Sequence, residues 1–160
     1  MVSATITVSD EFNALAVAYG RALHMDNPME GAIQKLNLAK SIARDAEAIG
    51  AEIVVARHLG LIDFRPSIDT FKNSADVGAR IEVKHTAWND GHLIVKPSDR
   101  DTDYAVLVTG ESPNYTIVGW LPVSVCKTPR FKSDTSNSWW VSQINLRSME
   151  SLPGVDSWSK

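Results

Sequence analysis

The sequence predicts an α+β fold in one domain of 160 residues. Apolar residues recur at helical spacing between about residues 10 and 60, and a two-residue alternation replaces this spacing between residues 80 and 121. Strands so close together cannot enclose long crossover helices. We therefore expect a mixed, mostly antiparallel β-sheet flanked by helices. Residues 1–49 form an N-terminal helical segment, and residues 50–160 form the core.

Two helical stretches precede the strands. The first covers residues 10–24. A second start signal lies at residues 27–30, Asn-Pro-Met-Glu, because asparagine caps helices and proline favours the first helical position. At Gly50 the second helix is interrupted or bent, or the glycine allows a close backbone approach. Helical spacing then returns over residues 51–59, and Gly60 is the expected C-terminal stop.

Turn residues divide the rest of the chain into short strands. Residues 63–75 are polar, include a proline and predict a loop or an irregular strand. Strands are expected at residues 80–86, 92–96, 104–109, 115–121 and 139–141. A terminal turn of helix is expected within residues 145–152.

Composition limits the classes of protein that the chain resembles. The net charge of −3 argues against binding of nucleic acid by bulk charge, although a local patch or bridging cations would still permit it. The single cysteine, Cys126, excludes an internal disulfide and suits a reducing compartment. Neither an apolar run of about 20 residues nor a signal peptide is visible. We expect a cytoplasmic protein that is not embedded in a membrane.

The most informative stretch is the strand at residues 80–86. Side chains alternate along a strand, so Glu82 and Lys84 project from one face about 7 Å apart. Ile81 and Val83 then face a core on the other side. The strand thus presents a carboxylate and an ammonium on the same surface.

A second carboxylate is expected beside this strand. Gly78 and Ala79 form a tight reversal that brings Asp76 next to Glu82. Two convergent carboxylates repel each other unless a cation lies between them, and oxygen ligands suit Mg²⁺. Lys84 alongside can position a water or stabilise negative charge in a transition state. These groups suit metal-assisted hydrolysis of a phosphodiester.

The order of these residues resembles the PD-(D/E)XK nuclease superfamily. The resemblance is carried by Asp76, by residues 82–84 as the E-x-K motif and by Glu52 on the upstream helix, within about residues 50–121. Ala75 stands where the family has a proline, and only five residues separate the aspartate from Glu82. Asp69 gives a wider gap and is the alternative for the aspartate.

The resemblance implies a restriction-endonuclease-like fold and a Mg²⁺-dependent endodeoxyribonuclease, with Mn²⁺ as a possible substitute. Asp76 and Glu82 would hold the metal, together with the Val83 carbonyl and Glu52. Lys84 would orient the attacking water. The structural alternative is that Glu82 and Lys84 form a surface salt bridge on an edge strand, with Asp76 a simple turn residue.

A basic segment is the expected nucleic-acid-binding surface. Residues 112–133 contain no acidic residue, and Lys127, Arg130 and Lys132 cluster around Phe131. The cations would contact phosphates while Phe131 stacks on a base. The alternative is a solvated loop.

Other polar residues have mainly structural interpretations. His85 points away from Lys84 and is structural, whereas His92 begins a strand and could approach the site. Arg57 points away from Glu52, although it could touch a phosphate. The acidic residues at 99–103 could supply a second metal ligand, but a charged, solvated turn is the preferred interpretation.

Three tryptophans are assigned from their place in the predicted strands. Trp139 and Trp140 are adjacent and point to opposite faces, so one belongs to the core and the other is exposed. Trp120 ends an apolar strand and belongs to the core.

The partner expected from the resemblance is DNA. A single active site makes one cut, so cleavage of both strands of a duplex requires a second copy of the chain. We therefore expect a homodimer or a higher homo-oligomer that associates through the N-terminal helices. The alternative function is a catalytically inactive nucleic-acid-binding or assembly protein that retains the nuclease fold.

Overall fold

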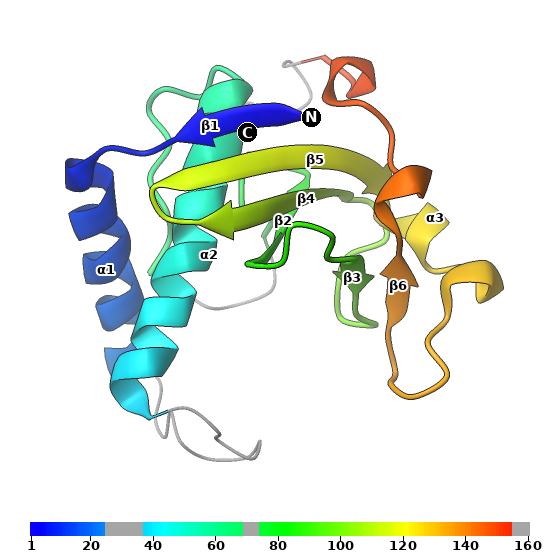
Figure 1. The fold of residues 1–160 in the computed structure, drawn as a ribbon, viewed down its shortest axis with the longest axis horizontal. Coiled ribbons are helices and arrows are strands. Elements are labelled where there is room, and N and C mark those ends of the chain that lie inside the picture. Colours follow the sequence, from blue (N-terminus) through cyan, green and yellow to red (C-terminus); the bar gives the residue numbers. More distant parts are fainter. Residues whose placement is uncertain (25–36, 69–73, 155–160) are drawn as a thin grey trace.

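The computed structural model describes residues 1–24, 37–68 and 74–154. At its centre is a four-stranded sheet in the order β1-β5-β4-β2 (Figure 1). The strands are β1 (Val2–Thr5), β2 (Ile81–Thr86), β4 (Tyr104–Glu111) and β5 (Asn114–Pro122). β5 pairs antiparallel with β1 and β4, whereas β2 pairs parallel with β4. The fold is α+β with a mixed, mostly antiparallel sheet, as the sequence predicts.

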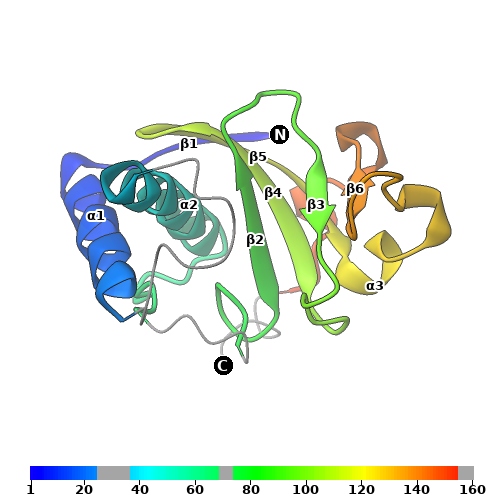
Figure 2. The ribbon, with the colours of Figure 1, turned by 90° about the horizontal axis from the view of Figure 1, so that it is seen from below.

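Two helices form the layer on one side of this sheet. Figure 2 shows α2 (Leu38–His58) next to the sheet and α1 (Val8–Leu23) packed against α2. A capping box begins α1: the Thr7 hydroxyl accepts from the Asp10 N–H, and the Asp10 carboxylate accepts from the Thr7 N–H. Asn37 caps α2 through its side chain. The predicted helix start at residues 27–30 lies outside the described residues.

Gly50 lies within α2, which runs from residue 38 to residue 58 without interruption. A Cβ atom placed on Gly50 would lie 2.2 Å from the hydroxyl of Tyr115 on β5. The glycine therefore serves a close approach, and its alternative role as a helix break is wrong. Gly60, with φ of 78°, follows the end of the helix as predicted.

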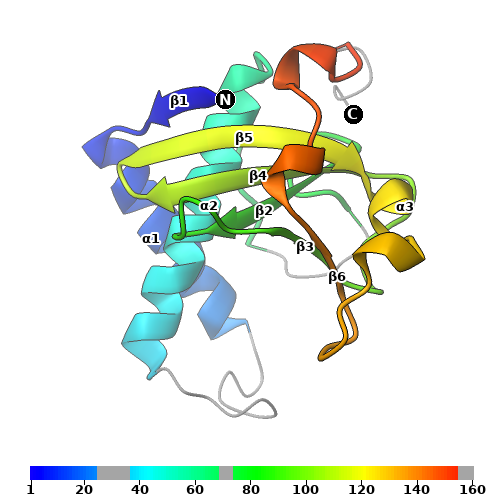
Figure 3. The same cartoon turned by 45° about the vertical axis from the view of Figure 1, so that its right-hand side comes forward.

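A smaller layer covers the opposite face of the sheet. It consists of the antiparallel pair β3 (Leu93–Val95) and β6 (Trp139–Val141) and the short helix α3 (Val123–Cys126) (Figure 3). Three 3-10 turns follow the main sheet, at Pro129–Phe131, Gln143–Asn145 and Met149–Ser151. The last two fall close to the predicted C-terminal helical turn.

The main sheet separates two hydrophobic cores. Val106 and Val108 of β4 face the helices, and Ala105 and Leu107 face the smaller layer. Ile81 and Val83 of β2 belong to the helix-facing core. Glu82 and Lys84 consequently lie on the face that carries β3 and β6, as the alternation predicts.

Two features of the sheet differ from the expectation. The strand β1 was not predicted, because its four residues give too short a pattern. The parallel pairing of β2 with β4 arises because β3 leaves the main sheet between them. Leu93 and Val95 of β3 are fully buried in the second core, so burial there determines the path of the chain.

Candidate functional site

The strand β2 ends the main sheet and carries the E-x-K side chains. Glu82 is buried, and the Lys84 Nζ atom lies 3.4 Å from the Glu82 Oε1 atom. The Lys84 side chain is 18% exposed, so this pair is neither a surface salt bridge nor fully enclosed. The predicted placement of both side chains on one face is confirmed.

Asp76 lies beside this strand through the predicted reversal. Val77 and Ile81 exchange two backbone hydrogen bonds, and Gly78 between them has φ of 58°. The Val83 N–H donates to Asp76 Oδ2 at 2.8 Å. The Asp76 carboxylate is thus attached to the backbone of the E-x-K motif. The Val83 carbonyl leaves the strand on the same side as its N–H.

Glu52 supplies a third carboxyl group from α2. Its side chain is buried, and the Oε2 atom has no hydrogen-bond partner among the residues that the structure describes. The nearest cation, Arg21 Nη2, lies 3.6 Å away, too far for a hydrogen bond. Burial and the negative charge of Asp76 raise the pKa of Glu52 to about 8, and Glu82 adds to this effect. Glu52, Asp76 and Glu82 are therefore electrostatically coupled.

Lys84 is held from its other side by Asp99. The Lys84 Nζ atom lies 2.7 Å from Asp99 Oδ2, which also accepts the Lys96 N–H. Burial alone would lower the pKa of Lys84. The hydrogen bond to Asp99 and the charge of Glu82 outweigh that effect and raise this pKa above its usual value. Lys84 is therefore a charged donor at neutral pH.

The preferred interpretation of residues 99–103 as a solvated turn is wrong for two of its carboxylates. Asp99 and Asp103 are buried, and Asp103 forms a two-pronged ion pair with Arg100. Asp99 contacts Lys84, so it takes part in the site. Its position just after an apolar strand was the signal that made it a possible metal ligand in the sequence, although the solvated turn was preferred there.

The carboxyl groups do not form a closed ligand set. Within the described ranges, no group of three or more His, Cys, Asp and Glu side chains is arranged to hold a metal ion. Asp69, the alternative aspartate, lies outside the described residues.

The cations of the predicted basic surface have contacts within the chain, and one of them reaches the backbone of Asp99. Lys127 Nζ contacts Asp101 Oδ1 at 2.6 Å and the Asp99 carbonyl at the same distance. Arg130 donates to Asn145 Oδ1, and Lys132 donates to the Ser136 carbonyl. The role of these three cations in nucleic-acid binding stays a prediction.

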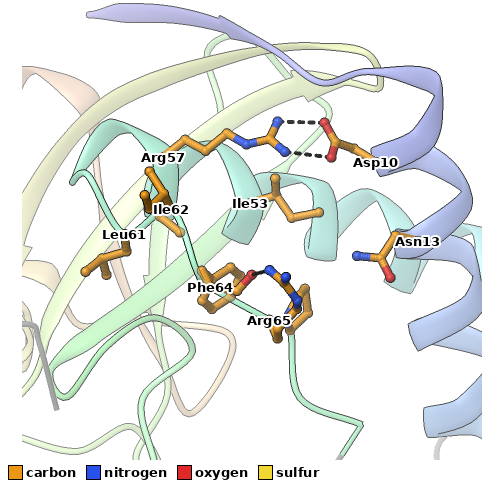
Figure 4. A pocket seen from close by; sticks show the side chains of 10 residues that line it. Asp10, Asn13, Ile53, Arg57, Leu61, Ile62, Phe64 and Arg65 are labelled. Carbon is orange, nitrogen blue, oxygen red and sulfur yellow. Dashed lines mark hydrogen bonds and ion pairs between the residues drawn. The ribbon is translucent and has the colours of Figure 1, made fainter.

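Arg57 points away from Glu52, as expected. Figure 4 shows its guanidinium joined to the Asp10 carboxylate by two contacts of 2.6 Å, at the rim of a small pocket between α1 and α2. The bond to Arg57 holds the pKa of Asp10 well below its usual range. This pair joins the two helices.

A groove of about 620 Å³ opens beside Lys84. His92, which the sequence places within possible reach of the site, lines it together with Trp88 and Trp140. His85 also borders the groove, but its Nε2 atom bonds the Gly110 carbonyl, which supports the structural interpretation. Trp88 was missed in the sequence, where a tryptophan next to an Asn-Asp-Gly turn was the available signal.

The three tryptophans assigned from the predicted strands agree with the sequence. Trp139 packs against the second core, Trp140 is 45% exposed, and Trp120 is buried. Trp139 and Trp140 are successive residues of β6, and successive side chains of a strand point to opposite faces.

Comparisons with protein-family models, with curated proteins and with solved structures find no match to this chain. In the part of the chain that the structure describes, no helix has the length and apolar character needed to cross a membrane. The geometry of the site is therefore the basis for any statement about function.

Proposed function

We propose that this protein is a Mg²⁺-dependent endodeoxyribonuclease that hydrolyses DNA phosphodiester bonds. The observation that carries the proposal is the buried Glu52 carboxyl, whose Oε2 atom has no hydrogen bond within the described residues. Its pKa is raised by the charges of Asp76 and Glu82 as well as by burial. The Arg21 ion pair at 3.6 Å does not supply a hydrogen bond to this buried oxygen, and the placement of Glu52 near two further carboxylates suits a cation ligand.

The chemical type of these donors suits a hard divalent ion. Glu52, Asp76 and Glu82 offer carboxylate oxygens, and the Val83 carbonyl leaves β2 on the side where Asp76 is bound. Oxygen donors of this kind favour Mg²⁺, and Mn²⁺ can take its place. A bound ion would offset the carboxylate charges and stabilise negative charge on the phosphate in the transition state.

Lys84 has a defined task in this proposal. Because Glu82 and Asp99 keep it protonated, it serves as a donor and not as a general base. Its ammonium would orient the attacking water or bind a phosphate oxygen. The water loses a proton to solvent as its oxygen forms a bond to phosphorus, the bond to the 3′ oxygen breaks, and the 3′ oxygen takes up a proton from solvent. The products are a 5′-phosphate and a 3′-hydroxyl.

Cleavage assays test the proposal directly. Plasmid, single-stranded and junction DNA are incubated with the wild type, Lys84→Ala and the control Lys40→Ala, in Mg²⁺ or in EDTA. Lys40 is an exposed lysine on α2, far along the helix from Glu52. We expect Mg²⁺-dependent cleavage that Lys84→Ala lowers by about 100-fold or more and Lys40→Ala leaves unchanged. A wild type inert on all three substrates in Mg²⁺ and in Mn²⁺ would refute the proposal.

One observation favours the alternative of an inactive nucleic-acid-binding or assembly protein. Lys84 is already bound on both sides, by Glu82 and by Asp99, as a purely structural lysine would be. That alternative predicts DNA binding without cleavage in either metal. It also predicts that Lys84→Ala lowers the stability of the protein and leaves DNA affinity unchanged.

We further propose a cytoplasmic homodimer joined through α1. Five apolar side chains on this helix are exposed, at a spacing of three or four residues: Val8, Phe12, Leu15, Tyr19 and Leu23. Such spacing forms one stripe along a helix, and a second copy of the same stripe can cover it. The buried Cys126 thiol is compatible with a reducing cytoplasm.

A further inference from the structure

Two tryptophans at the mouth of the groove beside Lys84 expose much of their surface. Trp88 is 75% exposed and Trp140 is 45% exposed, and both line the groove. The His92 ring lies beside Trp140, with ring centroids 5.7 Å apart. Large aromatic faces left in water have a cost that burial against a ligand would remove.

The wall that carries Trp88 is fixed in place. Gln143 Nε2 donates to the carbonyls of Asn89 and Gly91, which ties the turn after β2 to the 3-10 turn Gln143–Asn145. A Cβ atom on Gly91 would lie 2.5 Å from Thr86 Cγ2, so the turn packs tightly. The groove wall is therefore formed before any ligand binds, which lowers the entropic cost of binding.

Trp140 is also held in one orientation. Its indole Nε1 donates to Ser138 Oγ at 2.9 Å, and its backbone pairs with Ile94 across β3 and β6. Because the polar edge of the indole is already bonded, the ring face is the part left for a ligand. A flat π-face is the feature that stacking on a nucleobase requires.

The charges around the groove suit a phosphate backbone. Lys84, which is paired with Glu82 and Asp99, lines the groove together with the exposed Lys96 and with Asp90, so Lys96 at its rim is the cation that a phosphate can contact first. Lys84 also belongs to the proposed catalytic site, so the groove and that site are continuous. A strand whose phosphate reaches Lys84 would place its neighbouring bases next to the tryptophans.

The form of the DNA follows from this arrangement. Bases inside a duplex stack on one another and cannot offer their faces to a side chain, whereas unpaired bases can. The groove volume lies within the range of about 300–1,000 Å³ for small-ligand sites, which suits one or a few unstacked nucleotides. We infer that this groove binds unpaired nucleotides next to the scissile phosphate, so the substrate is single-stranded, frayed or branched DNA. This inference rests on the proposed function for the link to cleavage.

Binding is measured first, without metal, so that it does not depend on catalysis. A fluorescent 12-mer of unpaired deoxynucleotides and the matching duplex are titrated in EDTA at low salt. The proteins compared are the wild type, Trp88→Ala, Trp140→Ala and the control Ile62→Ala, which removes an exposed apolar side chain elsewhere. We expect the single strand to bind more tightly than the duplex. Each tryptophan replacement should weaken this binding about 10-fold, and Ile62→Ala should not.

Two further variants separate stacking from folding. Trp88→Phe keeps a ring and should restore most of the affinity that Trp88→Ala loses, whereas Lys96→Ala should weaken binding and lower its salt dependence. If the wild type binds duplex at least as well as single strand, or the tryptophan variants bind as the wild type does, the inference is overturned.

Cleavage in Mg²⁺ then distinguishes this failure from failure of the proposed function. If the wild type cuts duplex efficiently and both tryptophan variants cut equally well, the nuclease proposal stands and the groove has no part in it. If the tryptophans are needed to bind single strands but no substrate is cut, the groove assignment stands and the nuclease proposal fails.

Discussion

At the scale of the residue, Glu52 couples proton binding to folding. Its pKa rises from 4.5 to about 8 in the folded chain because of burial and the charge of Asp76. Between these two values the folded state binds more protons than the unfolded state does. The free energy of unfolding of the metal-free protein therefore falls as pH rises through this interval.

Glu52→Gln should remove most of this pH dependence, because glutamine keeps the shape and never ionises. In EDTA at pH 8, we expect the variant to be more stable than the wild type by on the order of 2 kcal/mol, and the difference should shrink towards pH 5. Urea unfolding at pH 5, 6.5 and 8 measures this.

Glu111→Gln, at an exposed position at the end of β4, is the matched control and should follow the wild type. Addition of Mg²⁺ at pH 8 should stabilise the wild type and not Glu52→Gln. Equal pH slopes for the wild type and Glu52→Gln would show that the Glu52 carboxyl does not bind the extra proton.

The site residues differ in how far the sequence could predict them. The alternation in residues 80–86 was sufficient to place Glu82 and Lys84 on one face, and the glycine turn was sufficient to bring Asp76 close. Asp99 lies fifteen positions from Lys84, and only the tertiary fold brings the two side chains together. Burial of Glu52 likewise depends on the packing of α2, which no local pattern reveals.

At the scale of the element, the contact between α2 and β5 depends on one missing side chain. Tyr115 donates its hydroxyl to the Glu47 carbonyl, one turn before Gly50 on the same helix. The ring consequently crosses the helix at Gly50, where a Cβ atom would overlap the hydroxyl. Glycine lowers helix propensity, so its place within a long helix is explained by this crossing.

Gly50→Ala should destabilise the protein by about 1–3 kcal/mol, because α2 or the Tyr115 ring must shift. The double variant Gly50→Ala with Tyr115→Phe should recover part of the loss, since it removes the overlapping oxygen. Thermal and urea unfolding measure both. Gly154→Ala, where a Cβ atom meets nothing within 4 Å, is the control and should be neutral. A neutral Gly50→Ala would contradict the close approach.

Helices and strands were more predictable than their partners. Apolar spacing and glycine signals identified α1, the C-terminal end of α2 and five of the strands, because these signals are local. The path of β3 is not local: Leu93 and Val95 lie in the second core, and this leaves β2 and β4 to pair in parallel. The alternation along β2 is the same whether β3 or β4 is its neighbour, so the sequence could not distinguish these two pairings.

At the scale of the whole molecule, the exposed stripe on α1 gives the homodimer proposal a direct test. Phe12→Glu and Tyr19→Glu place charges in the middle of the stripe and should convert a dimer to a monomer. Sedimentation equilibrium at micromolar concentration measures the mass. Ile62→Glu adds a charge at another exposed apolar position and should leave the dimer intact. A monomeric wild type would refute the proposal.

The bond between Asp76 and the Val83 N–H has a consequence for the solubility of variants. β2 is the last strand of its sheet, and unpaired backbone donors on such a strand invite pairing with another molecule. Asp76 occupies one of these donors, and Val77 pairs with Ile81 just before it. Replacement of Asp76 by alanine would therefore free the Val83 N–H for pairing with another molecule, and this variant should aggregate more readily than the wild type. Replacement by asparagine removes the charge but keeps an acceptor for the Val83 N–H, so this second variant should remain as soluble as the wild type.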